Sequence, residues 1–143
     1  MNSDMIAIFL SVYGQKETPG TADNPFILQM AKDCGFTDYT HDSIAWCSLT
    51  ANWVALKAGY ERSKSLAARS WLTVGEATDA PETGDIVVLW RDDPKGSFGH
   101  VGLYINGHGS PAINIGAGNQ GDMINIESFP VTRVLGYRRL AKA

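Results

Sequence analysis

The chain has 143 residues, 44% of them hydrophobic and 19% charged, so we expect one globular domain (1–143) with a sizeable core. Its net charge of −3 at pH 7 argues against a protein that wraps nucleic acid by bulk electrostatics. The two cysteines, Cys34 and Cys47, do not amount to a disulfide framework, and we expect both to be thiols.

The first predicted element is a short helix. Apolar residues recur at helical spacing from Met5 to Tyr13, and Gly14 ends the run. Its apolar stretch is too short to cross a bilayer, and the residues before Met5 lack the basic region of a signal peptide. We therefore expect synthesis in the cytoplasm without an export signal, and no stable membrane insertion.

Two longer helices are predicted next. Asn24 and Pro25 resemble a helix cap and first turn, so a helix is expected over 26–34, with Gly35 after its end. A third helix is expected from a cap at Asp42 or Ser43 to Gly59, with Cys47 in or just before its first turn. A short fourth helix is expected over 65–72.

Beyond residue 81 the hydrophobic pattern changes to that of strands. Apolar and β-branched runs separated by Gly, Asn, Asp and Pro predict strands over 85–91, 101–105, 112–115, 123–127 and 134–139, with a hairpin loop at 92–96. Helices followed by strands indicate an α+β fold with an antiparallel sheet.

Cys47 and His100 are the candidate catalytic pair. A thiol in the first turn of a helix is near unpaired N–H groups and the positive end of the helix dipole, which favours the thiolate. A histidine at the start of a strand can then act as its base. The alternative is that Cys47 is a small core residue and His100 an ordinary strand histidine.

Several segments together resemble a known family. They are AWCS (45–48) with NW (52–53), LAARSWL (66–72), GDIVVLWR (84–91), GHVGLYI (99–105), GNQ (118–120) and RVLGYRR (133–139). In this order they are similar to the CHAP family of cysteine, histidine-dependent amidohydrolases and peptidases and to its NlpC-type relatives. The resemblance implies a papain-like α+β fold, with N-terminal helices packed on an antiparallel sheet.

The resemblance also assigns roles to residues. It implies that Cys47 is the nucleophile and His100 the base, and that a polar residue from the next strand is the third catalytic group. Asn119 is the first choice for this group, with Gln120 and Asn114 behind it. The other two histidines, His41 and His108, are expected to be non-catalytic.

Substrate contacts are expected from Trp46, Arg69 and Gln120. Trp46 flanks the nucleophile, and Arg69 is in a segment that borders the groove in the family, where a guanidinium suits a carboxylate. The alternative for Arg69 is a solvated surface charge. No metal site or cofactor is expected, because the cysteines and histidines lack zinc-ligand spacing and no clear Asp/Asn calcium loop is present.

The function that the resemblance implies is cleavage of an amide bond in bacterial peptidoglycan, as in a phage endolysin. We expect an endopeptidase that cuts the stem peptide, because Arg69 would bind a stem-peptide carboxylate. The alternatives are an N-acetylmuramoyl-L-alanine amidase, an antibacterial effector with the same chemistry, and a non-catalytic wall-binding module. We expect a monomer that reaches the wall after release by a holin-like partner or a secretion system.

Overall fold

The computed structural model describes residues 1–18, 23–38 and 46–143, and these form an α+β fold. Its helices are α1 (Ser3–Ser11), α2 (Pro25–Cys34) and α3 (Cys47–Ala58), with the 3₁₀ turns η1 (Ala68–Thr73) and η2 (Val131–Arg133). The predicted boundaries of α2 are confirmed: the Asn24 side chain accepts a hydrogen bond from the N–H of Phe26 at 2.8 Å, and Gly35 is left-handed. The predicted fourth helix is the short turn η1.

The second half of the chain forms a six-stranded antiparallel sheet, in the order β1-β6-β2-β3-β4-β5. Its strands are β1 (Glu76–Thr78), β2 (Ile86–Trp90), β3 (Gly99–Asn106), β4 (Ala112–Gln120), β5 (Met123–Pro130) and β6 (Val134–Arg139). This confirms the predicted α+β class and all five predicted strands. β1 was not predicted, because it has only three residues and no alternation of apolar side chains.

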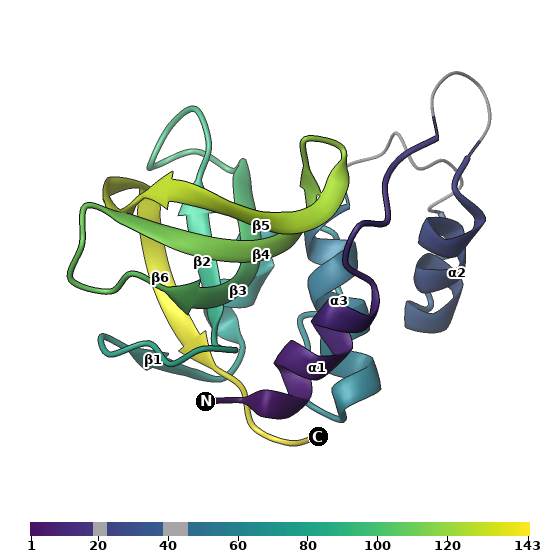
Figure 1. The fold of residues 1–143 in the computed structure, drawn as a ribbon, viewed down its shortest axis with the longest axis horizontal. Helices are drawn as coiled ribbons and strands as arrows, with labels where there is room; N and C mark the ends of the chain where they lie inside the picture. Colours follow the sequence, from purple (N-terminus) through teal and green to yellow (C-terminus); the bar gives the residue numbers. More distant parts are fainter. Residues whose placement is uncertain (19–22, 39–45) are drawn as a thin grey trace.

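Each face of the curved sheet has its own core. Val88 and Val101 pack with the helices, whereas Leu89 and Tyr104 belong to a smaller cluster on the opposite face. The helices cover one face of the sheet, and α3 contacts β3 and β4 directly (Figure 1). Gly116 permits the close approach of α1 to β4, since a Cβ atom there would be 2.7 Å from the ring of Phe9.

The segment after α1 connects the helical half to the edge of the sheet. The N–H of Gly14 donates to the carbonyl of Ile124 at 2.8 Å, and the N–H of Ile124 donates to Gln15 at 2.7 Å. Lys16 continues this pairing opposite Met123, at the start of β5. None of the helices in the described ranges has the length and hydrophobicity needed to cross a membrane.

Candidate active site

Cys47 is the first residue of α3. The predicted cap residues, Asp42 and Ser43, and the histidine at 41 lie outside the described residues; Trp46 occupies the N-cap position and makes no side-chain cap hydrogen bond. The Cys47 side chain is 6% exposed, and it lies close to the backbone N–H of Val101, the residue after His100. The helix N-terminus thus brings the thiol to the start of β3.

The thiol of Cys47 is not activated in the free protein, contrary to the prediction from the helix dipole. Burial raises its pKa, and the N–H groups of Val101, Ser48 and Cys47 itself, together with the charge of Arg91, only partly oppose this. The thiol loses most of its hydration at this position, and that cost exceeds the stabilisation by helix N–H groups. Cys47 is therefore protonated at neutral pH.

His100, on β3, has its orientation and tautomer set by Gln120. Its Nε2 atom is 2.9 Å from Oε1 of Gln120, and the two side chains are both buried. The amide nitrogen of Gln120 donates to the carbonyl oxygens of Ile115 and Asn125 and to Oδ1 of Asn125, at 2.8 to 3.2 Å. Because the amide nitrogen of Gln120 already donates to these acceptors, the group that faces His100 is Oε1, and Oε1 accepts the Nε2–H. Nδ1 of His100 is then left with a free lone pair.

Asn119, the first choice for the third group, does not bind His100, and Gln120 takes that place. Gly118 packs against Trp46 on the helix side of β4, so regular alternation would also direct Gln120 toward the helices. Asn119 instead has a φ of 61°, and the pairing of β4 with β5 shifts between Ala117 and Gln120. This bulge reverses the alternation and turns Gln120 toward His100.

The candidate pair is neutral in the free protein. Burial lowers the pKa of His100 from its ordinary 6.5 to about 4; the hydrogen bond with Gln120 opposes the shift, and the charges of Arg91 and Arg133 add to it. Among the described residues, no hydrogen bond joins Cys47 directly to His100. The thiol and the imidazole are thus each neutral and do not form an ion pair, and the contacts of the imidazole are with Gln120 and Phe129.

A hollow of about 250 Å³ opens beside the imidazole. The residues lining it are Arg91, His100, Asn119, Gln120, Gly121, Glu127, Phe129 and Arg133. The ring of Phe129 packs on the imidazole with its centroid 5.3 Å away, and Arg133 is fixed by two hydrogen bonds to the carbonyl of Trp90. The charged walls of this hollow were not among the predicted site residues.

Arg69 has a structural role that the sequence did not predict. Its guanidinium donates to the carbonyl oxygens of Phe98, Pro94 and Asp93 at 2.9, 3.0 and 2.7 Å. All three nitrogens are thus used in holding the connection between β2 and β3. Two of the five N–H groups of Arg69 are not used in these contacts, so the predicted substrate contact stays a prediction.

Trp46 and two of the other predicted residues lie away from the hollow. Trp46 is fully buried, and its indole N–H donates to Glu17 at 2.8 Å, so it belongs to the core and not to a cleft wall. His108 is exposed beyond the far end of β3, where its N–H donates to the hydroxyl of Tyr104. The side chain of Asn114 donates to Asn106 at 2.7 Å, near the same end.

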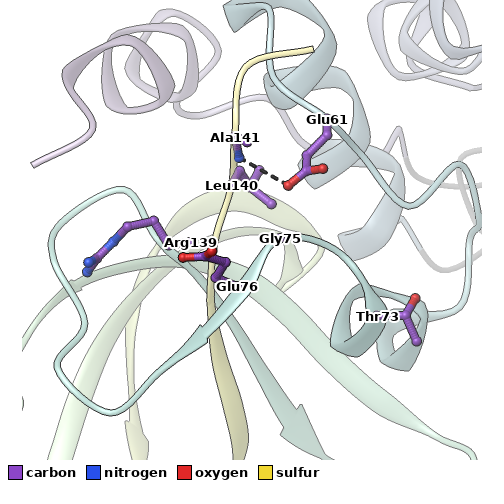
Figure 2. A pocket seen from close by; sticks show the side chains of 7 residues that line it. All are labelled: Glu61, Thr73, Gly75, Glu76, Arg139, Leu140 and Ala141. Carbon is purple, nitrogen blue, oxygen red and sulfur yellow. Dashed lines mark hydrogen bonds between the residues drawn. The ribbon is translucent and has the colours of Figure 1, made fainter.

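A larger hollow, of about 540 Å³, lies where the C-terminal residues pass β1 (Figure 2). Figure 2 shows Glu61 reaching the N–H of Ala141, at 3.0 Å, while the side chain of Arg139 extends away from them. The guanidinium of Arg139 donates to the carboxylate of Asp85 at 2.8 Å. The described residues that line it include no thiol and no imidazole. Of these two hollows, and within the described part of the chain, only the smaller one is lined by an imidazole, that of His100, and the thiol of Cys47 lines neither of them.

Comparison with known proteins gives a likeness in fold. No protein-family model matches the chain, and no curated protein matches it. Among solved structures, it is similar to a crystal structure of an NlpC/P60 family protein from Bacillus cereus ATCC 10987, with a TM-score of 0.55 and 17% sequence identity. The match covers 97% of this chain and 40% of the other, so the chain spans about two fifths of that protein's length. The α+β arrangement of helices on an antiparallel sheet is thus an NlpC/P60-like fold.

Proposed function

We propose that this protein is a cysteine hydrolase of peptidoglycan amide bonds, with Cys47 as nucleophile and His100 as general base. The observation that carries the proposal is the hydrogen bonding of the Gln120 amide. Its nitrogen donates to other acceptors and its oxygen accepts the Nε2–H of His100, so Nδ1 of His100 can take a proton. The NlpC/P60-like fold and the motif resemblance support a cell-wall substrate. Gln120, not Asn119, is the proposed third catalytic group.

The proposed reaction begins from the neutral pair. Sγ of Cys47 bonds to the carbonyl carbon as its proton passes to Nδ1 of His100, and the N–H of Cys47 helps to stabilise the oxyanion. The C–N bond then breaks, the leaving nitrogen takes the proton from His100, and a thioester remains. Water attacks the thioester while His100 accepts its proton, and that proton returns to the departing thiolate. The two side chains approach each other only when substrate binds, as is common in unliganded sites.

The proposed bond is within the stem peptide. The Arg69 contact stays a prediction, and the walls of the hollow support this choice independently: Arg91, Arg133 and Glu127 suit a charged peptide better than a neutral sugar. The competing candidate is the amidase, whose acyl-transfer chemistry is identical. Endolysin-like release onto the wall and contact-dependent delivery as an effector remain the two proposed routes to the substrate.

Digestion of purified peptidoglycan followed by mass spectrometry tests the proposal. New peptide amino termini on strands that keep their first stem residue are expected, whereas glycan stripped of intact stems would establish the amidase. Cys47→Ala, Cys47→Ser and His100→Ala should each lose most of the activity, and His108→Ala should stay within a few-fold of the wild type. Lysis at the wild-type rate by Cys47→Ala would refute the assignment and favour a non-catalytic wall-binding module.

A further inference from the structure

The hollow beside His100 contains one arginine that the fold does not use. Arg91 follows β2 directly, its side chain is exposed, and among the described residues its guanidinium makes no hydrogen bond or ion pair. Arg133, on the same hollow, is instead held by the carbonyl of Trp90 and by its packing on Phe129. The hollow therefore has one fixed and one available guanidinium, with Glu127 as its only acidic lining residue within the described part of the chain.

An available guanidinium beside a catalytic base suits a particular kind of substrate group. A guanidinium binds a carboxylate through two parallel N–H···O bonds, which fixes orientation as well as adding affinity. Arg91 is also close enough to Cys47 and His100 for its charge to act on both. A carboxylate bound at Arg91 would thus share the hollow with the imidazole of His100.

We propose, on the basis of the proposed hydrolase function, that Arg91 binds a carboxylate on the residue that leaves as the amine. His100 must pass its proton to the leaving nitrogen, so that residue lies beside the imidazole and over the hollow. The preferred substrate is therefore an amide whose leaving amino acid bears a free carboxylate. Arg133 provides the second positive wall, and Glu127 disfavours any additional anion.

Two matched peptides test this specificity. They have the same sequence up to the scissile bond, and the leaving residue carries either a free carboxylate or a carboxamide. The wild type is expected to cleave the carboxylate peptide with a kcat/KM about tenfold higher, mainly through KM. Arg91→Gln should reduce that ratio to about one, and Arg91→Lys should keep part of it, since an ammonium supplies charge without the fork geometry.

The ratio of kcat/KM for the carboxylate peptide to kcat/KM for the carboxamide peptide separates recognition of the carboxylate from general electrostatic effects. Any change that Arg91→Gln makes to the pKa of Cys47 or His100 affects both peptides equally and cancels. Lys95→Gln removes the same charge from the neighbouring connection, outside the hollow, and should preserve the wild-type ratio. Glu127→Gln should raise the ratio, because it removes the opposing negative charge.

The outcomes distinguish the two levels of the proposal. Equal cleavage of both peptides by the wild type, or an unchanged ratio in Arg91→Gln, would overturn the carboxylate site and leave the hydrolase intact. Cleavage of neither peptide, together with no cleavage of peptidoglycan, would overturn the proposed function itself. Direct binding of the leaving amino acid to Cys47→Ala, measured by calorimetry, reports on the carboxylate site without any turnover.

Discussion

Replacing His100 by glutamine should remove much of the acid sensitivity of folding. Because burial lowers the pKa of His100 to about 4 from its ordinary 6.5, the imidazole stays neutral in the folded protein while the unfolded chain takes up a proton. Acid therefore favours the unfolded state, and this begins as the pH falls through about 6.5 and levels off below about 4. The side chain is almost fully buried, so solvent screening does not remove the effect.

The size of the effect follows from the two pKa values. Between about pH 7 and about pH 4.5, protonation of His100 in the unfolded chain lowers the free energy of unfolding by about 2.5 kcal/mol. For a domain of this size that is a substantial part of the free energy of unfolding. His100→Gln has no such group, so its free energy of unfolding should fall less with acid by about that amount.

Urea denaturation of both proteins across this pH range measures the difference directly. Asp33, whose pKa is lowered by hydrogen bonds from Trp53 and Gln29, adds acid sensitivity to both proteins and cancels in the comparison. As the pH falls from about 7 to about 4.5, the free energy of unfolding of the wild type should decrease by about 2.5 kcal/mol more than that of the variant. Parallel curves would refute the neutral, buried imidazole and with it the neutral starting pair.

Three further predictions concern the neighbours of the site. Gln120→Glu should raise the pKa of His100 by placing a carboxylate beside it, so the acid limb of kcat/KM should move to higher pH; an unmoved limb would contradict the positioning role of Gln120. Cys34→Ala should keep near-wild-type activity in the peptidoglycan assay, because Cys34 is in α2 and its burial raises its pKa to about 11; loss of hydrolysis would implicate the wrong thiol. Arg69→Ala should speed amide hydrogen exchange in residues 93–98, and unchanged exchange there would show that the three carbonyl contacts do not hold that connection.

Hydrophobic periodicity was sufficient to predict most of the fold. The strand at 86–90 has a strong local signal in its run of β-branched residues, and the helix before Gly35 has one in the proline and glycine at its two ends. β1 has no such signal and is defined by its pairing with β6, which is a tertiary property.

The sequence predicts those features of the site that depend on neighbouring residues in the chain, and not those that depend on tertiary structure. Cys47 at a helix start and His100 at a strand start follow from their neighbours in sequence. The bulge at Asn119 is a property of the sheet, and without it the alternation rule directs the wrong side chain at the imidazole. The partners of Arg69 are more than twenty residues away, and the raised pKa of Cys47 depends on how deeply the assembled fold buries the helix end.

The order in which the candidate catalytic residues are synthesised has a consequence for the cell that makes the protein. Translation proceeds from the N-terminus, so Cys47 leaves the ribosome well before His100, and Gln120 emerges later still. The pairing of residues 14–15 with Ile124 also has to wait for the last third of the chain. A nascent chain accordingly carries a protonated thiol with no oriented base, and on the proposed mechanism hydrolytic activity arises only once synthesis has passed the β4–β5 hairpin.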